Sequence, residues 1–302
     1  MRIGIDLGGT KIEGIVMGEG SRILHRERVA TPRGDYAGAL VALAEMVKAL
    51  ETAAGTLGLS VGVGHPGAIS PATGRLKNSN STWMNDKPLK QDLERALGRE
   101  IRMANDADCF ALSEASDGAA AGARCVFGVI LGTGCGGGVV VDGKLLSGPN
   151  AIAGEWGHNP LPWPRPEWNE VPGPQCWHGG YGCLETWISG SGLAADHQRV
   201  TGEALPAEQI EARADAGDER CSATMSRFED RLARALAAVI NLIDPHVIVL
   251  GGGVSGVRRL YRNVPALWDQ WIFSDRVDTK LVPPMHGDAS GVRGAAWLWP
   301  ES

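Results

Sequence analysis

Short runs in which apolar residues alternate with polar or glycine residues predict β-strands along this chain. Longer segments with apolar residues at helical spacing predict helices between them. The two kinds of segment alternate on both sides of the middle, which is typical of a two-lobed α/β protein. Strands are predicted at 2–6, 11–17, 59–64, 102–104 and 125–131, and helices at 35–52, 89–97, 107–121, 184–199 and 219–243.

The same pattern predicts two domains. We place the division near 119–122, so that residues 1–118 form an N-terminal α/β lobe and residues 119–287 a C-terminal one. The segment 288–302 has helical character and is expected to join the first lobe. The irregular stretch 159–175 is rich in Pro and Trp, and a loop of that length in a compact domain is usually functional.

A first glycine cluster, in D-L-G-G-T-K, joins two predicted strands. A dinucleotide-binding loop would instead open a helix at this point. We therefore interpret the turn as a phosphate-binding hairpin, with the Gly8–Thr10 amides facing phosphate oxygens and Asp6 orienting hydrated Mg²⁺. An ordinary hairpin turn is the alternative for this motif taken alone.

A second cluster, L-G-T-G-C-G-G-G at Leu131–Gly138, repeats the strand–glycine–strand arrangement. A third, at Gly251–Ser255, follows a strand and precedes a helix-like segment, where backbone amides suit an anion or a nucleotide edge. Each cluster could be a mere turn. Three of them at strand ends, two in matching hairpins, favour two related halves that face one nucleotide.

The stretch 154–185 combines G-E-W-G-H-N-P with Q-C-W-H-G-G-Y-G-C-L-E. Its two imidazoles and two thiols form a set suited to tetrahedral zinc. Glycines between the last two candidate ligands let the chain fold back tightly. Unrelated buried cysteines and surface histidines are the alternative. Four protein ligands would leave no open position, so the zinc is expected to be structural; the ligands are His158, Cys176, His178 and Cys183.

Composition excludes several classes of protein. The chain has 302 residues, a net charge of −6 and no basic run, so we expect no nucleic-acid or acidic-membrane partner. No apolar stretch approaches the roughly 20 residues that span a bilayer. A strand pattern begins at Arg2, which leaves no room for a signal peptide. Together with six cysteines outside any disulfide pattern, this predicts a cytoplasmic protein with reduced thiols.

The motifs together resemble those of the ROK family of bacterial sugar kinases, in the actin/hexokinase/Hsp70-like ATPase superfamily. The resemblance runs from M-R-I-G-I-D-L-G-G-T-K through N-S-N-S-T-W, A-N-D-A and G-E-W-G-H to H-G-D-A-S-G-V-R-G-A-A. It implies a two-lobed actin-like, ribonuclease H-like fold with a ligand cleft between the lobes. It also implies ATP, Mg²⁺ and a hexose as ligands, and a homodimer.

N-P-L-P-W and the C-terminal segment are most similar to the fructokinase, or manno(fructo)kinase, branch of this family. The resemblance therefore implies phosphorylation of D-fructose to fructose 6-phosphate, with mannose as a further substrate. An N-acetylglucosamine kinase or glucokinase is the alternative. These sugars differ by one substituent or stereocentre, which the motifs do not specify.

Position by position, the resemblance makes Asp106 of A-N-D-A the catalytic base. The chemistry requires such a group, because a sugar hydroxyl attacks phosphorus well only as a carboxylate accepts its proton. The alternative for Asp106 is a helix N-cap. The resemblance assigns sugar contacts to Gly67, Asn80, Asn105, Asp106, Glu155, His158 and Glu185. The nucleotide and Mg²⁺ residues are then Asp6, Gly8, Gly9, Thr10, Lys11, Gly132, Thr133, Gly134, Gly136, Gly251, Gly252, Gly253 and Ser255.

Two positions depart from the family pattern. His178 stands where the metal loop usually has a third cysteine, and we expect zinc to be kept with a neutral ligand at this point. His65, in G-H-P-G, replaces a residue that is more often small or aliphatic, and its role stays open between sugar and solvent contact.

Two functions of other classes are weighed against a kinase. A ROK transcriptional repressor would carry a winged-helix domain before the first hairpin, and here the hairpin begins at once. A structural or chaperone ATPase of the superfamily does not explain the sugar-site carboxylates and the metal loop.

Overall fold

The computed structural model describes residues 1–300, which form two compact units. Unit 1 consists of Met1–Gly122, Gly138–Ala153 and the segment from His286 onward, and unit 2 of Ala123–Gly137 and Gly154–Met285. The C-terminal segment thus belongs with the N-terminal residues; its last two positions, 301–302, lie outside the described residues. The assignment of Gly138–Ala153 to unit 1 differs from the single division near 119–122 that the sequence suggests.

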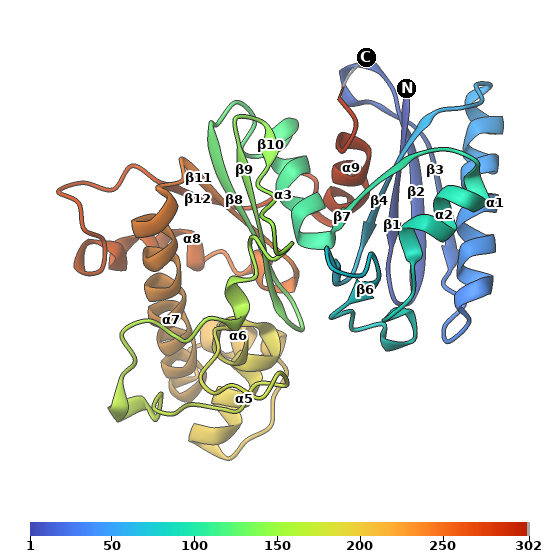
Figure 1. Ribbon diagram of the computed structural model, residues 1–302. Coiled ribbons are helices and arrows are strands. Elements are labelled where there is room, and N and C mark those ends of the chain that lie inside the picture. The colour runs from blue at the N-terminus through green and yellow to red at the C-terminus, as the bar shows by residue number, and fades with distance from the viewer. Residues whose placement is uncertain (301–302) are drawn as a thin grey trace. The chain divides into compact units, whose positions relative to one another are not determined.

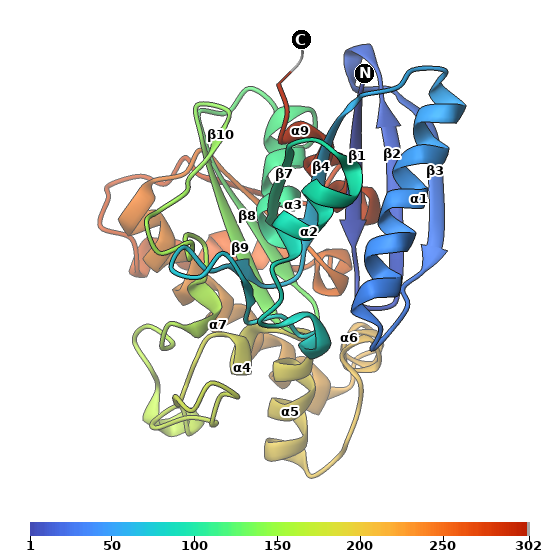
Figure 2. The ribbon, with the colours of Figure 1, turned by 45° about the vertical axis from the view of Figure 1, so that its right-hand side comes forward.

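Unit 1 is built on a five-stranded mixed sheet in the order β3-β2-β1-β4-β7 (Figures 1 and 2). β1, β2 and β3 are antiparallel neighbours, whereas β4 and β7 run parallel to β1. A separate two-stranded ribbon pairs β5 with β6. The strands are β1 (Arg2–Leu7), β2 (Lys11–Met17), β3 (Ile23–Ala30), β4 (Ser60–His65), β5 (Ala68–Ile69), β6 (Leu76–Lys77) and β7 (Ile101–Asn105).

Helices cover both faces of this sheet (Figure 1). On one face α1 (Tyr36–Ala54) contacts β2 and β3, with α2 (Leu89–Leu97) beside it. Asp35 caps α1 by accepting a hydrogen bond from the Gly38 amide. On the other face α9 (Ser290–Trp297) contacts β1, β4 and α3 (Asp106–Ser116).

Glycines allow α9 to approach its neighbours at backbone distance. A β-carbon at Gly62 would lie 1.8 Å from the Ala295 carbonyl oxygen, and one at Gly294 would lie 1.7 Å from the Cys109 carbonyl oxygen. No real side chain tolerates such contacts, so any larger residue would push α9 away from the sheet and from α3. The C-terminal helix is therefore part of the core of unit 1.

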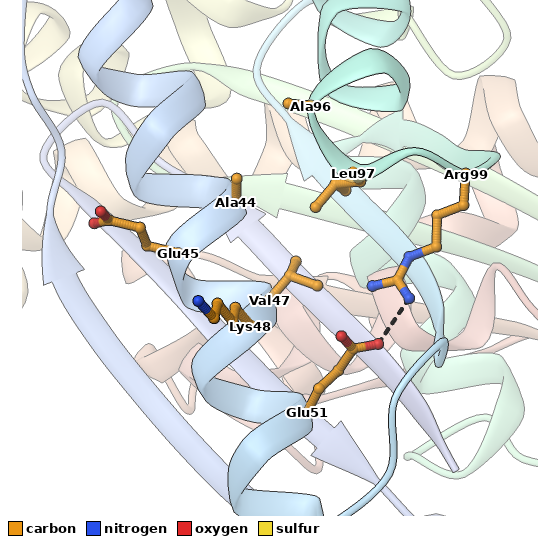
Figure 3. A pocket seen from close by; sticks show the side chains of 8 residues that line it. All are labelled: Ala44, Glu45, Val47, Lys48, Glu51, Ala96, Leu97 and Arg99. Carbon is orange, nitrogen blue, oxygen red and sulfur yellow. Dashed lines mark hydrogen bonds and ion pairs between the residues drawn. The ribbon is translucent and has the colours of Figure 1, made fainter.

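A shallow hollow lies between α1 and α2 on the outside of unit 1 (Figure 3). Its floor is apolar, and the Glu51–Arg99 ion pair, 2.7 Å between Oε1 and Nη1, closes one end. None of the residues predicted to bind a ligand lines it.

Unit 2 contains most of the second sheet, in the order β10-β9-β8-β11-β12, whose strand β9 continues past Gly137 into unit 1. The helices α4 to α7 form a cluster in which α7 contacts the other three. The strands of this second sheet are β8 (Cys125–Leu131), β9 (Cys135–Val141), β10 (Lys144–Leu145), β11 (Val247–Gly251) and β12 (Lys280–Val282), of which β10 belongs to unit 1. The helices of unit 2 are α4 (Glu185–Ile188), α5 (Gly190–Thr201), α6 (Ala207–Asp215), α7 (Glu219–Ile243) and α8 (Leu260–Asn263).

Buried arginines of α7 hold the Pro/Trp-rich insertion. The Glu170 carboxylate accepts hydrogen bonds from Arg231 Nε at 2.7 Å and from Arg234 Nη2 at 2.9 Å, and all three side chains are buried. Arg234 Nη1 also donates to the carbonyl oxygens of Pro162 and Trp163. A buried pair of this kind is costly to break, because one charge would remain unpaired. The insertion is consequently fixed although it contains little regular structure.

The strands and helices predicted from periodicity are confirmed within a few residues, and α2, α7 and β8 match their predicted bounds. The predicted helix at 184–199 is wrong in one respect, because Ser189 has extended backbone angles and separates α4 from α5. The Ser189 hydroxyl instead caps α5 by accepting from the Gly192 amide. The predicted helix at 107–121 ends earlier, at Ser116. Within residues 1–300 we find no helix with the length and apolarity needed to cross a membrane.

Candidate functional site

The first glycine hairpin connects β1 to β2 in unit 1. The Gly8 amide donates to the Lys11 carbonyl oxygen at 3.0 Å, and Thr31 supports the turn by donating from Oγ1 to the Gly8 carbonyl oxygen at 2.7 Å. Neither Gly8 nor Gly9 has a positive φ. Space is the reason for glycine at Gly8, where a β-carbon would lie 2.9 Å from the Lys11 carbonyl oxygen; at Gly9 it would lie 3.0 Å from Ser81 Oγ. The turn exposes backbone without side chains, as a phosphate site requires.

Two carboxylates lie close together at the strand ends of unit 1. Burial, and after it repulsion from Asp106 and Glu13, together raise the pKa of Asp6 to about 6. A β-carbon on Gly291, in the first turn of α9, would contact the Asp6 carboxylate at 3.4 Å. Two acids that repel each other beside a helix start form a place where a divalent cation would relieve the repulsion. This arrangement fits Mg²⁺.

Asp106 is the first residue of α3, and it is exposed. The N-cap is its neighbour Asn105, whose Oδ1 accepts from the Ala107 amide at 2.8 Å. Asn105 Nδ2 donates to the Gly67 carbonyl oxygen at 3.0 Å. The N-cap of α3 is therefore Asn105, and the alternative interpretation of Asp106 as the helix cap is wrong. Asn105 uses both polar atoms within the protein, so its first task is to connect α3 to the Gly67 turn.

The loops that carry Gly67 and Asn80 are fixed by close contacts with neighbouring backbone and with the Asn85 side chain. Gly67 has a φ of 76°, and a β-carbon there would lie 2.4 Å from the Lys77 carbonyl oxygen, so only glycine fits. Asn80 is exposed on a loop fixed by Asn85, whose side chain bonds both the amide and the carbonyl of Ser79.

The His65 side chain is buried in the interior of unit 1. It is 2% exposed, and its Nδ1 lies 3.2 Å from the Pro66 carbonyl oxygen. Burial lowers its pKa to about 4, so the ring is neutral at physiological pH. Of the two roles left open for His65, contact with solvent is therefore excluded.

Lys11 and two arginines surround a buried carboxylate. Glu13 is 1% exposed and accepts from Arg28 Nε at 2.7 Å and Arg26 Nε at 2.6 Å, while Lys11 Nζ lies 3.4 Å away. Burial alone would raise the pKa of Glu13, but the hydrogen bonds from Arg28 and Arg26 lower it overall. Lys11, predicted to bind the nucleotide, thus has a protein partner but stays about half exposed.

In unit 2 the second glycine loop is shorter than predicted. β9 begins at Cys135, so Gly136 lies in a strand and the turn is limited to Gly132–Gly134. The third cluster packs directly on it: Gly252 has a φ of 75°, and its β-carbon would lie 2.5 Å from the Leu131 carbonyl oxygen. Gly253 faces open space. The two glycine loops are neighbours, as a shared ligand would need.

The third cluster does not lead directly into an α-helix as the sequence predicts. Its end forms a single 3-10 turn, Gly253–Gly256, and the short helix α8 begins only at Leu260. The Ser255 hydroxyl closes this turn by donating to the Gly252 carbonyl oxygen at 2.7 Å. Ser255 therefore shapes the loop, and the backbone of Gly252 and Gly253 is what remains for a ligand.

The G-E-W-G-H motif packs onto β8 and β9. Trp156 is buried, meets Phe127 edge-on at 5.3 Å and donates from Nε1 to the Gly136 carbonyl oxygen at 3.1 Å. A β-carbon at Gly157 would lie 2.1 Å from the Cys135 carbonyl oxygen. The tryptophan and the second glycine thus anchor the motif, and Glu155 remains exposed.

Glu185, the first residue of α4, is held at both carboxylate oxygens. Oε2 accepts from the Cys135 amide at 3.0 Å, and Oε1 accepts from Trp177 Nε1 at 3.0 Å. Burial raises the pKa of the Cys135 thiol well above its usual range, and the carboxylates of Glu185 and Glu155 raise it further. Both acids therefore lie near this thiol, which stays protonated and unreactive.

The four predicted zinc ligands come together in unit 2. Their ligand atoms all lie within 4.8 Å of one another, and among the described residues they form a group able to hold a metal ion. Cys176 Sγ is 3.7 Å from His158 Nδ1, and Cys183 Sγ is 3.9 Å from His178 Nε2. Tetrahedral zinc, with bonds of about 2.3 Å to sulfur and 2.0 Å to nitrogen, places such ligand pairs about 3.5 Å apart. The set therefore fits zinc after small side-chain shifts.

Each glycine position in the metal loop favours glycine for its own local reason. Gly179 and Gly182 have φ values of 97° and 67°, which favour glycine. Gly180 leaves room for the His178 ring, whose Cε1 would be 2.6 Å from a β-carbon. The Cys176 amide donates to the Gly180 carbonyl oxygen at 2.7 Å and closes the loop.

The predicted residues are thus grouped within each unit. Unit 1 carries Asp6, the first hairpin, the Gly67 and Asn80 loops, and Asp106. Unit 2 carries the other two glycine loops, Glu155, Glu185 and the metal set. The sequence motifs do not single out Trp177 as a site residue, because a tryptophan between two ligand positions carries no signal of its own. They do not single out the Cys135 amide either, because residue type does not show where a backbone amide will donate its hydrogen bond.

These features define a class: an α/β protein with the two-lobed actin-like ATPase fold, phosphate-type glycine hairpins and a Cys/His metal loop. The family model described as "ROK family" matches residues 2–302. The chain belongs to the ROK family.

Similar proteins extend over almost the whole chain. N-acetyl-D-glucosamine kinase of Pectobacterium atrosepticum is 40% identical, covering 99% of this chain and 98% of that protein. The N-acetyl-D-glucosamine kinase of Escherichia coli O157:H7 is 39% identical, covering 99% of both. The crystal structure of ROK hexokinase from Thermus thermophilus superimposes with a TM-score of 0.87 at 31% identity, covering 98% of this chain and 96% of that one. A ROK glucokinase from Streptomyces griseus, in complex with glucose and AMPPNP, gives 0.76 at 27% identity, covering 98% of both.

The raised pKa of Asp6 predicts a pH-dependent effect of Asp6→Asn. The ionised carboxylate is disfavoured in the fold, so this stability penalty is absent below pH 4, grows as pH rises toward 6, and is complete above. Without divalent metal, Asp6→Asn should therefore stabilise the protein by about 3 kcal/mol at pH 8 and by much less at pH 4. Urea unfolding in EDTA at both pH values measures this. Equal stabilisation at both would contradict the assignment.

Gly134 and Gly132 make a matched pair of variants. A β-carbon at Gly134 would lie 2.7 Å from Glu185 Oε2, whereas one at Gly132 meets nothing within 4 Å. If Glu185 binds the sugar, Gly134→Ala should raise the sugar KM by about tenfold or more, since small misplacements are costly. Gly132→Ala should leave the sugar KM nearly unchanged. Steady-state kinetics with the sugar varied at saturating ATP checks this, and equal sugar KM values in the two variants would contradict it.

Proposed function

We propose that this chain, an ATP-dependent hexose kinase of the ROK family, phosphorylates N-acetyl-D-glucosamine on its 6-hydroxyl group. The observation that carries the proposal is the 38–40% identity, over 99% of the chain, to bacterial relatives named N-acetyl-D-glucosamine kinase. The fructose substrate expected from the branch-level motifs has no comparable support. The alternative stated beside it, N-acetylglucosamine, takes its place.

Asp106 serves as the general base in this proposal. As the sugar hydroxyl oxygen bonds to the γ-phosphorus, its proton passes to the Asp106 carboxylate, and the bond from phosphorus to the β,γ-bridging oxygen breaks to release ADP. Its position supports the role, because Asp106 is exposed at the start of α3 while Asn105 provides the cap. Asn105 acts on the sugar side mainly by connecting α3 to the Gly67 turn.

Unit 2 supplies the other proposed sugar ligands. Glu155 and Glu185 both lie near the Cys135 thiol, so the two carboxylates share one neighbourhood. His158 directs Nδ1 toward Cys176, which leaves Nε2 to bind a hydroxyl. Carboxylates and an imidazole are suited to a neutral sugar, whose hydroxyl groups both donate and accept hydrogen bonds. In unit 1, Gly67 and Asn80 are proposed to contact the same substrate.

ATP is proposed to bind the glycine loops through their backbone amides. The residues are Gly8–Thr10 with Lys11, Gly132–Gly134, and Gly251–Gly253 beside the adenosine. Mg²⁺, when bound near Asp6, supplies charge neutralisation to the phosphates. The family resemblance also implies a homodimer in the cytoplasm, and both remain predictions.

Zinc is proposed to be structural. His158, Cys176, His178 and Cys183 would provide four protein ligands, so no position is left for substrate or water. Its contribution would be to hold the loop from which Glu185 and His158 extend. His178 takes the place of a cysteine in this set, and the distances reported above accommodate its imidazole.

A coupled assay that reports kcat/KM across a hexose panel tests the proposed function. We expect N-acetyl-D-glucosamine to exceed glucose, mannose and fructose by at least about tenfold, the range that one substituent provides. Asp106→Asn should lower kcat by at least about 100-fold while sugar and nucleotide still bind, as thermal shifts would show. A preference for fructose would overturn the substrate, and near-normal kcat in Asp106→Asn would overturn the base.

Cys183→Ser tests the metal, with Cys221→Ser as the matched control. Both thiols are buried, but Cys221 lies on α7 outside the ligand set. We expect about one zinc per wild-type chain by elemental analysis. Cys183→Ser should lose zinc, stability and sugar affinity with little change in nucleotide affinity, and Cys221→Ser should keep its zinc. His178→Cys should also keep metal and activity. A fully active Cys183→Ser protein without metal would contradict the proposal.

A further inference from the structure

Trp177 is a large aromatic residue that is 68% exposed in the metal loop. It lies between two of the proposed ligands, Cys176 and His178, so its backbone is fixed by the loop on both sides. Neither the family motif nor the proposed chemistry uses it. An exposed indole held in one place generally marks a contact surface, because tryptophan offers much rigid area with few rotatable bonds.

The indole bridges two residues assigned to the sugar. Its Nε1 donates to Glu185 Oε1 at 3.0 Å, and its ring meets the His158 ring edge-on at a centroid distance of 5.3 Å and an angle of 85°. The Cys135 amide holds the other Glu185 oxygen at 3.0 Å. Each of the two carboxylate oxygens of Glu185 thus accepts one hydrogen bond from the protein. Each of its oxygens keeps a second lone pair for a sugar hydroxyl.

The remaining surface of Trp177 is apolar. Its only hydrogen-bond donor is already used, because indole nitrogen donates and does not accept. The exposed ring therefore offers a wall that favours carbon over oxygen beside Glu185 and His158. Among the hexoses considered above, N-acetyl-D-glucosamine alone carries a methyl group, on its acetamido substituent.

We propose that Trp177 is a positioning and selectivity residue of the sugar site. Its N–H fixes Glu185 for hydrogen bonding to the sugar, and its ring packs against the acetamido methyl group. This inference rests on the proposed function and deepens it, since it names a structural reason for preferring a 2-acetamido sugar to its 2-hydroxy counterpart. Loss of the ring removes the preference for the 2-acetamido sugar, whereas loss of the N–H alone weakens the binding of all the sugars to a similar degree.

Two variants separate these tasks. Trp177→Phe keeps an aromatic wall but removes the donor, so KM for N-acetyl-D-glucosamine and for glucose should rise by a similar factor of about three to ten. Trp177→Ala removes both, so the ratio of kcat/KM between the two sugars should also fall by about tenfold. The ATP KM should stay near the wild-type value in both variants. Because the side chain is largely exposed, neither change removes much packing.

The matched control is Trp163→Phe, which alters another exposed tryptophan of unit 2 that stacks on Trp271, 5.2 Å between centroids. It should leave sugar KM and selectivity unchanged. Zinc content and melting temperature, measured on every variant, show whether the metal loop is intact. Unchanged KM in both Trp177 variants, or an unchanged sugar ratio in Trp177→Ala, would overturn the inference. Failure of the wild-type protein to phosphorylate N-acetyl-D-glucosamine would instead overturn the proposed function.

Discussion

The hydrogen bond from the Cys135 amide to Glu185 is the contact on which the arrangement of unit 2 depends. It joins the start of β9 to the start of α4, and through Trp177 the same carboxylate reaches the metal loop. One side chain thereby connects β9 to a later segment that contains both the metal loop and α4. The arrangement also explains why Gly134 has no side chain, since a β-carbon there would displace the carboxylate. The Glu185 carboxylate is therefore already ordered, and holding it in place would add little entropic cost to the binding of a ligand.

Glycine serves this fold mainly by creating space. Gly62 and Gly294 let α9 approach β4 and α3 at backbone distance, and Gly157 lets the G-E-W-G-H turn rest on β9. None of these three has a positive φ. Gly252 does have one, and it also packs against the second glycine loop. The glycine loops and the helix that completes the core of unit 1 thus share one requirement, because in both the backbone meets another surface directly.

The carboxylates of this protein occur in two kinds of surroundings, paired with arginines or close to another carboxylate. Glu13, Glu170 and their arginines are neutralised within the protein, and they fix the edge of one sheet and the Pro/Trp-rich insertion. Asp6 and Asp106 repel each other instead; burial raises the pKa of Asp6 most, and this repulsion raises it in the same direction. Carboxylates kept together against repulsion indicate a site for a cation and for proton transfer, whereas paired ones indicate structure. The two kinds of cluster can therefore be told apart by their local electrostatics.

Sequence by itself determined the elements whose causes are local. The hairpin at Asp6–Lys11, helix α7 and the four metal ligands follow from periodicity, glycine turns and ligand chemistry within short spans. Tertiary structure decided what depends on distant partners. Ser189 breaks the predicted helix because it caps α5 and because the Gly190 amide bonds the Gly132 carbonyl oxygen. Gly136 became strand because β9 pairs beyond the turn, and Trp177 reached Glu185 only through the folded loop. Backbone amides and long-range contacts leave no trace in residue type, and for that reason they could not be predicted.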